Sequence, residues 1–326
     1  RIDGPQGRRF YSLFIFFVRT GFYPVFNDNY LMLANIEEKY KQHCLQENFS
    51  VLDDPDNLPA NYILVTDKLF SALENNAFKT IIVNYQPDYK VTDVCFPMPF
   101  PMFSPIYALQ QDLQLEKYRQ QQRHWKIFFG GDAERGKYNK KTIREIYAKL
   151  SRAQIIQHLS TNLAIEHYSE LTNTDDLLDA QKAIHAGVVV MNTRQCKVDT
   201  AQWLSNLARA DFFLACPGVR YPLSHNLVEA LAVGSIPITQ YPELFFPPLE
   251  DGKNCLVFNS EAELLAVIKK AMSMSALEVT VLSRAAVEYY ETYMAPTHCI
   301  QRLLNHASHR ISLRILPFLK AGGGFA

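Results

Sequence analysis

The sequence lacks an excess of charge of either sign, because 33 Lys and Arg residues balance 33 Asp and Glu residues to a formal net charge of +0. A protein that binds nucleic acid through bulk electrostatics would carry a clear positive excess. That class is therefore disfavoured, although a local basic cleft is not. The expected partner is a small molecule or a neutral polymer.

Patterns for metal binding and for membrane insertion are also missing. The six cysteines include no CxxC pair and several lie in apolar runs, so we expect buried free thiols. There is no HExxH motif, and the histidines are too dispersed for a metal site. The most apolar run near the start is FYSLFIFFV, which is far shorter than the roughly 20 residues of a membrane helix. We predict a cytoplasmic protein, free or peripheral to a membrane, with no metal and no cofactor; the sequence indicates no oligomeric state.

Short apolar runs alternate with helical patterns in two series, which is typical of βα units on parallel sheets. The first series contains the strand-like runs YPVF, FSVL, NYILVTD and KTIIVNY, and the second contains KIFFGG, GVVVMN, DFFLACPG and SIPIT. Between them lies the segment CFPMPFPMFSP, which its four prolines exclude from helices and central strands. A polar helix is expected over residues 109–125.

These patterns predict an α/β fold of two Rossmann-like lobes. We assign residues 1–120 to an N-terminal lobe and residues 121–295 to a C-terminal lobe. Residues 296–326 are expected to form a C-terminal helix and tail, with packing against the N-terminal lobe as one option.

One helix in the second lobe has an unusual polar start. It lies in the stretch YPLSHNLVEALAVGSIPIT, where Ser224 is the expected N-cap. The apolar residues of this helix share one face, whereas a second face carries His225, Asn226 and Glu229. The preceding run DFFLACPG is a buried strand that ends in a Pro-Gly turn, so the helix should start at the carboxyl edge of a sheet, where ligands of α/β proteins bind.

This combination suits a ligand that carries both a phosphate and a diol. The phosphate would take the free N–H groups and the positive dipole of the helix start. The Glu229 carboxylate would accept hydrogen bonds from two ribose hydroxyls. The alternative is a helix whose polar residues merely face water.

The same stretch resembles the donor-binding half of GT-B glycosyltransferases. The pattern E-A-x-x-x-G-x-I-P-[IV] is matched by Glu229, Ala230, Gly234, Ile236, Pro237 and Ile238. This part is most similar to the exostosin-like branch, and the downstream YPELFFPPLEDGKNCLVFNSEAELLAVIKKAM is similar to the glycogen-synthase-like branch. The resemblance covers residues 210–272 well and the first lobe hardly at all.

The resemblance implies a GT-B fold, in which two Rossmann-like lobes face a cleft, with a helical C-terminal tail. It also implies sugar transfer from a nucleotide-sugar donor to a saccharide or glycoconjugate acceptor. Glu229 would bind the ribose, and no divalent metal is expected, because GT-B enzymes generally need none. Tyr221 stands where the glycogen-synthase-like branch carries a second glutamate, so retention or inversion of the anomeric centre stays open.

Several residues are candidates for binding or stabilising the departing diphosphate. Gly131 ends a strand where a backbone can approach a phosphate, and Arg135 and Lys137 follow in the next loop. Arg220 lies just past the Pro-Gly turn. For each cation the alternative is an ordinary solvated charge or a salt bridge.

The first lobe offers a loop and a set of possible bases. Gly4, Gly7 and Arg8 lie in the loop that opens the chain, and in GT-B proteins this loop often faces the cleft; the alternative is a flexible chain end. A general base for an inverting transfer would come from the end of a strand in this lobe. Asp67 is the candidate we name, with Asp28 and Asp88 as equivalents that the sequence does not separate.

Two other functions fit the same fold. A nucleotide-sugar epimerase would keep the donor site but need no acceptor. A non-catalytic carbohydrate-binding subunit would keep the fold without activity, and Tyr221 is the feature that suggests it.

Overall fold

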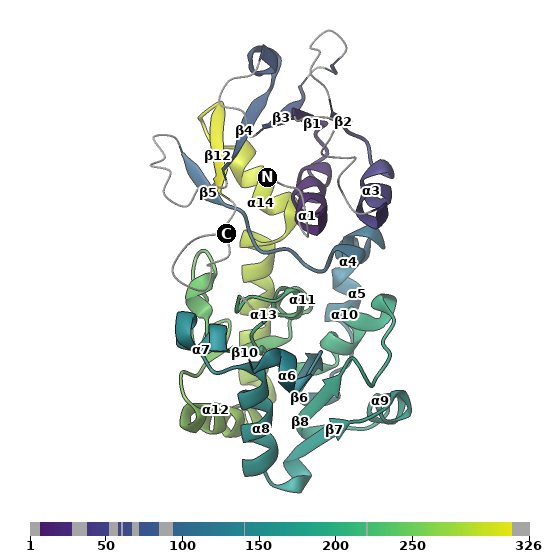
Figure 1. Cartoon of the computed structure of the whole chain (residues 1–326), viewed down its shortest axis with the longest axis vertical. Coiled ribbons are helices and arrows are strands. Elements are labelled where there is room, and N and C mark those ends of the chain that lie inside the picture. The colour runs from purple at the N-terminus through teal and green to yellow at the C-terminus, as the bar shows by residue number, and fades with distance from the viewer. Residues whose placement is uncertain are drawn as a thin grey trace. The chain divides into compact units, whose positions relative to one another are not determined.

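The computed structural model describes residues 7–27, 38–51, 58–59, 61–66, 72–84, 94–139, 141–219 and 221–314. They divide into two compact units (Figure 1). The first holds the described residues up to Ser104 and from Met294 to Arg314, and the second holds Pro105 to Tyr293.

The chain passes from the first unit to the second at Ser104, ahead of the expected boundary near residue 120. The reason is that the helical turns after the Pro-rich segment pack on the second unit. Gln111 Nε2 donates to the Ala201 carbonyl oxygen at 3.0 Å, and Arg119 Nε donates to the Ala232 carbonyl oxygen at 2.9 Å.

The expected polar helix over residues 109–125 is broken into short pieces. Gln110 has a left-handed backbone (φ 54°), which ends one helix and starts a separate turn. The pieces are α4 (Ser104–Ala108), η3 (Gln111–Leu113) and α5 (Leu115–Arg119).

The first unit is built on a parallel six-stranded sheet with the order β2-β1-β3-β4-β12-β5. Its Pro-containing strand β5 lies at the edge, as the missing N–H of Pro97 requires. The elements are α1 (Gly7–Val18), β1 (Pro24–Asn27), α3 (Glu38–Leu45), β2 (Ser50–Val51), β3 (Ile63–Thr66), η2 (Ala72–Asn76), β4 (Lys79–Asn84), β5 (Cys95–Pro97), α14 (Pro296–Leu304) and β12 (Arg310–Arg314).

The end of the described chain is a strand as well as a helix. The expected C-terminal helix is present as α14, but Arg310–Arg314, within the expected tail, forms β12, which lies between β4 and β5. Ile311, Ser312 and Leu313 are all buried there, because β12 lies inside the sheet, with β4 on one side and β5 on the other. In addition, α14 contacts α1, and Thr297 Oγ1 donates to the Arg19 carbonyl oxygen at 3.2 Å.

The second unit has more elements than the sequence patterns indicate. After β6 the chain forms two separate helices, α7 (Lys141–Tyr147) and α8 (Arg152–Asn162), because Ser151 caps a new helix with a capping box. The strand β7 and the helix α9 were not expected, since both are short and polar.

The elements of this unit, besides α4, η3 and α5, are β6 (Trp125–Gly131), α6 (Arg135–Tyr138), α7 (Lys141–Tyr147), α8 (Arg152–Asn162), η4 (Ile165–His167), β7 (Tyr168–Leu171), α9 (Thr174–Ala180), β8 (His185–Asn192), α10 (Thr200–Ala208), β9 (Ala210–Leu214), α11 (His225–Val233), β10 (Ile236–Thr239), η5 (Pro242–Leu244), β11 (Leu256–Val257), α12 (Glu261–Ser273) and α13 (Ala276–Tyr293).

The sheet of the second unit is parallel, with the order β11-β10-β9-β6-β8-β7. From β6 the chain runs to β7 at one edge and back to β8, which lies beside β6, and then crosses to β9, β10 and β11 on the other side. The direction of winding therefore reverses between β6 and β9, which makes this pair the topological switch point of the sheet. The predicted α/β fold of two helix-flanked parallel sheets is confirmed, which is consistent with two Rossmann-like lobes.

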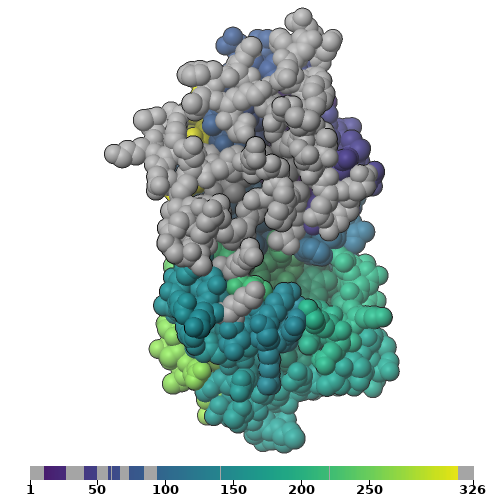
Figure 2. All heavy atoms as spheres, viewed as in Figure 1, coloured from purple at the N-terminus to yellow at the C-terminus, as the bar shows by residue number. Residues whose placement is uncertain are grey.

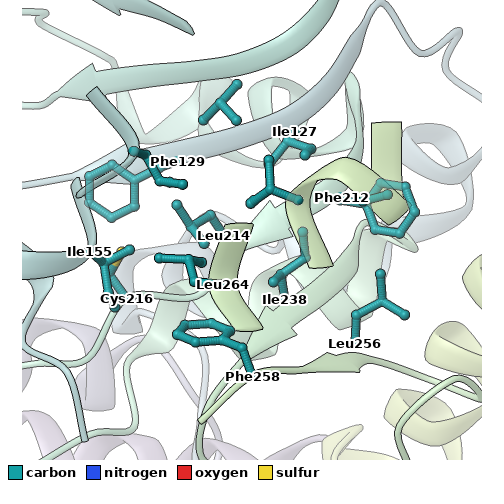
Figure 3. Close-up of a cluster of buried hydrophobic side chains, with 14 of the residues drawn as sticks. Ile127, Phe129, Ile155, Phe212, Leu214, Cys216, Ile238, Leu256, Phe258 and Leu264 are labelled. Carbon is teal, nitrogen blue, oxygen red and sulfur yellow. The ribbon is translucent and has the colours of Figure 1, made fainter. Parts of the chain in front are cut away.

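One face of this sheet packs on α8 and α12, which lie side by side (Figure 1). The close-up in Figure 3 shows Phe129 of β6, Leu214 of β9, Ile155 of α8 and Leu264 of α12 directed into one cluster. Residues of alternate register, such as Phe128 and Phe213, point to the opposite face. Figure 2 shows that, on this face of the molecule, residues from the first half of the second unit (teal) form much of the surface of that unit.

The C-cap of α11 is Gly234, which has a left-handed backbone (φ 77°) and is also closely packed. A Cβ there would lie 2.9 Å from Ser283 Oγ and 3.0 Å from Val287 Cγ2. Gly252 has a similar φ of 72° but no atom within 4 Å of such a Cβ. Alanine substitutions at these two glycines therefore distinguish the cost of backbone strain from the cost of steric overlap.

We predict that Gly252→Ala lowers the free energy of unfolding by about 1 kcal/mol, through backbone strain alone. Gly234→Ala should cost about 2–4 kcal/mol, because overpacking adds to that strain. Urea denaturation of both variants measures the difference. Equal losses would contradict the packing described for α11.

Candidate functional site

The carboxyl ends of β6 and β9 meet at the switch point of the second sheet. The start of α11 is fixed there by a side chain, because Asn226 Nδ2 donates to the Gly130 carbonyl oxygen at 2.7 Å. Gly131 lies next to this hydrogen bond, because a Cβ on it would be 3.5 Å from Asn226 Nδ2 and 3.4 Å from Arg152 Nη1. The structure thus brings the predicted residues Gly131 and Asn226 together.

The N-cap of α11 differs from those of α8, α9, α10 and α12, although the short helices α5 and α6 also lack a side-chain cap. Ser224 has the extended backbone of an N-cap, but its side chain makes no capping hydrogen bond. By contrast, the N-cap side chains of α8, α9, α10 and α12 all accept a hydrogen bond from a helix N–H group. The first N–H groups of α11 therefore have no side-chain cap from Ser224, and His225 begins this helix half-buried.

Glu229 is fully buried, with 0% of its surface exposed. Its Oε2 accepts a hydrogen bond of 2.6 Å from the indole Nε1 of Trp203 on α10. A buried carboxylate needs such donors, because it loses the hydration that stabilises its charge. The residue predicted to bind ribose is thus directed into the protein and is covered by Trp203.

The Trp203 ring reaches this position across Gly130. A Cβ on Gly130 would lie 2.8 Å from Trp203 Cη2 and 2.7 Å from the ring of Phe128, so no other residue type fits without rearrangement. Gly130, the first glycine of the FFGG run, therefore leaves room for the Trp203 indole. Gly131, the second glycine, lies at the carboxyl edge of the sheet, where a ligand would bind.

The predicted cations Arg135 and Lys137 lie on the short helix α6. Lys137 Nζ is 2.8 Å from Asp132 Oδ2, and Arg194 Nε is 3.2 Å from Asp132 Oδ1. Burial would raise the pKa of Asp132, but the hydrogen bonds and charges of its neighbours, Lys137 above all, outweigh that effect and lower it. Lys137 is thus neutralised by Asp132, whereas Arg135 is exposed and forms no ion pair with a described residue.

Sequence reasoning missed Arg152, the first residue of α8. This side chain is only 6% exposed and reaches the loops that follow both strands of the switch point. Nε donates to the Pro217 carbonyl oxygen at 3.2 Å, and Nη1 donates to the Asp132 carbonyl oxygen at 2.6 Å. No sequence signal marks it, because it follows an ordinary serine cap.

Tyr221 lies eight residues before Glu229, at the position discussed above for a second glutamate. It makes an edge-on ring contact with Tyr147 at a centroid distance of 5.7 Å. Burial, followed by the nearby Tyr147 and Glu243, raises the pKa of Tyr221 to about 12, so the phenol is neutral near pH 7. It cannot replace the negative charge of a carboxylate.

Some predicted site residues lie outside the described part of the chain. They are Gly4, Arg220 and Asp67, together with the alternative bases Asp28 and Asp88. Gly7 and Arg8 form the first turn of α1, although their side chains are not described. The structure therefore does not place a general base.

Neither a metal cluster nor a membrane-spanning helix occurs in the described residues. No group of three His, Cys, Asp or Glu side chains there could hold a metal ion. No helix among them is both long enough and apolar enough to cross a bilayer.

Comparison with known proteins finds similarity only at the level of structure. No family model matches the sequence, and no curated protein matches it. A structure of TarM from S. aureus, in complex with fondaparinux, alpha-GlcNAc-glycerol and UDP, overlaps 78% of this chain with 11% identity and a TM-score of 0.40. This chain spans only 57% of that protein.

Two further solved structures overlap more of the chain. The N-terminal domain of trehalose-6-phosphate phosphatase from Candida albicans matches 94% of this chain and 81% of its own, with 11% identity and a TM-score of 0.39. WaaG, a glycosyltransferase of lipopolysaccharide biosynthesis, matches 94% and 97%, with 12% identity and a TM-score of 0.36. TM-scores below 0.5 do not establish a shared fold, so these likenesses carry no weight for function.

The hydrogen bond between Trp203 and Glu229 can be measured by a double-mutant cycle. We predict that Trp203→Phe alone destabilises the protein through lost packing and loss of a hydrogen bond to a charged group, the latter worth about 1.5–3 kcal/mol. In a Glu229→Gln background, Trp203→Phe should cost less, because the charge is gone. Urea denaturation of the four proteins gives the coupling energy, and a value near zero would contradict this contact.

The pH dependence of stability tests the ion pairs of Asp132. Because its native pKa lies below the usual value of 3.8, Asp132 contributes stability that is present above that pH and is lost as the pH falls through the lowered pKa. The difference in unfolding free energy between the parent and Asp132→Asn should be constant above about pH 5 and shrink below it. A difference that stays constant down to pH 3 would contradict the lowered pKa.

Proposed function

We propose that this protein is a glycosyltransferase of the GT-B class, in its exostosin-like branch, that transfers a sugar from a nucleotide-sugar donor to a saccharide or glycoconjugate acceptor. The observation that carries the proposal is the buried Glu229, one turn into α11, a helix whose start is fixed against the end of β6. The E-A-x-x-x-G-x-I-P pattern of the sequence begins at this same glutamate.

In the proposed donor site, the diphosphate lies at the start of α11. The N–H groups of that turn have no cap from the Ser224 side chain, and the helix dipole favours an anion there. All described residues of this site belong to the second unit. Binding is proposed to require neither a metal nor a cofactor.

Ribose binding by Glu229 requires a local rearrangement. Since Trp203 Nε1 already occupies Oε2, a ribose hydroxyl must either replace the indole N–H or be accepted beside it. Exchanging one donor for another leaves the carboxylate hydrogen-bonded, so the step has no large electrostatic cost. Movement of the Trp203 ring is therefore part of the proposal.

A second candidate function is a non-catalytic carbohydrate-binding subunit. The observations that favour it are the covered carboxylate of Glu229 and the neutral phenol of Tyr221 in place of a second acid. Such a protein would bind a saccharide but no nucleotide-sugar.

A thermal-shift screen with UDP, GDP, ADP and CMP tests the donor site. A ligand at 100 times its Kd stabilises the native state by about 2.7 kcal/mol, so the preferred nucleotide should raise Tm. Glu229→Ala should abolish this rise, whereas Glu170→Ala, which removes an exposed carboxylate on β7, should keep it. Saccharide binding without any nucleotide response would support the second candidate, and donor isomerisation without acceptor would indicate an epimerase.

A further inference from the structure

Arg152 is a buried cation placed at the switch point of the sheet. Its two hydrogen-bond acceptors, the carbonyl oxygens of Asp132 and Pro217, follow β6 and β9 respectively. The guanidinium therefore spans the two loops between which ligands of open α/β sheets bind.

The guanidinium is also fixed in orientation by aromatic rings. Its central carbon lies 3.9 Å from the centroid of the Tyr138 ring and 5.5 Å from that of Phe129. Together with the two carbonyls, these contacts hold the planar group in one position, so little side-chain entropy remains to be lost on binding a ligand.

The positive charge of Arg152 has no negative partner among the described residues. The adjacent carboxylate of Asp132 is instead bound to Lys137 and Arg194, and no described acid lies within ion-pair distance of Arg152. Nη2 makes no hydrogen bond to a described residue. A buried charge is normally paired, and two carbonyl oxygens offset only part of its desolvation.

We propose that Arg152 binds the phosphate groups of the nucleotide at this edge, as the principal cation of the site. The inference deepens the proposed donor site and rests on it. It assigns to Arg152 the role expected of Lys137, because the Lys137 ammonium is already neutralised by Asp132. A guanidinium suits the role, since its fork can contact two phosphate oxygens.

A purely structural role for Arg152, joining the two loops, makes a different prediction. It would make substitution destabilising without changing which ligands bind. Arg123 is a matched control for that role, because its guanidinium also donates to backbone carbonyls, those of Ala210 and Gly234, at the opposite end of β6.

The experiment is calorimetric titration of the full chain with the preferred nucleoside diphosphate, its parent nucleoside and inorganic pyrophosphate. Arg152→Met should weaken nucleoside diphosphate binding about 10- to 100-fold and remove pyrophosphate binding, as expected for a lost hydrogen bond to a charged group. Nucleoside affinity should change less than about 3-fold. Arg152→Lys should fall between, and Arg123→Met should leave the diphosphate-to-nucleoside ratio unchanged.

Equal diphosphate binding by the parent and a folded Arg152→Met would overturn the inference while leaving the proposed function intact. If Arg152→Met does not fold, Arg152→Lys decides: a parental diphosphate-to-nucleoside ratio overturns the inference, and a lowered ratio supports it. If the parent binds neither nucleotide nor pyrophosphate, the proposed function and this inference both fail.

Discussion

The burial of the Glu229 carboxylate against the Trp203 indole is the constraint on which the site depends. A carboxylate with no exposed surface must be satisfied by donors inside the protein, and the indole N–H supplies one of them. The ring reaches it only because Gly130 has no side chain. One hydrogen bond thus couples α10 to α11, across the end of β6, and places an acid where a ligand would meet the sheet.

Among the described charges around this acid, the buried cation Arg152 has no acidic partner. Asp132 and Glu134 together neutralise Lys137 and Arg194 in the loop after β6. Arg152 instead contacts carbonyl oxygens and aromatic rings. The start of α11, without a cap from Ser224, adds positive potential on the same edge. The edge therefore favours an anionic ligand although the protein as a whole carries no net charge.

The features that were predictable from the sequence are those encoded locally. Buried runs such as KIFFGG identify β6, and Ser224 and Gly234 mark the two ends of α11 through their backbone preferences. The role of Arg152 was not predictable, because its burial depends on carbonyl groups that are distant in sequence. Likewise, the segment RISLR forms the strand β12 because it pairs with β4 on one side and β5 on the other, and these strands are distant in sequence. Lys137 was predicted as a cation for the diphosphate, but the fold pairs its ammonium with Asp132.

The central claim is that a nucleotide binds beside Glu229 and displaces or shifts the Trp203 indole. The protein has two tryptophans, so Trp203 becomes the only one in a Trp125→Phe chain. Titration of that chain with UDP, GDP and ADP, followed by tryptophan emission, measures the event directly. The account predicts a saturable change in emission for one nucleotide, absent when Glu229→Ala is added. Emission that stays constant at saturating nucleotide, with the chain folded, would contradict it.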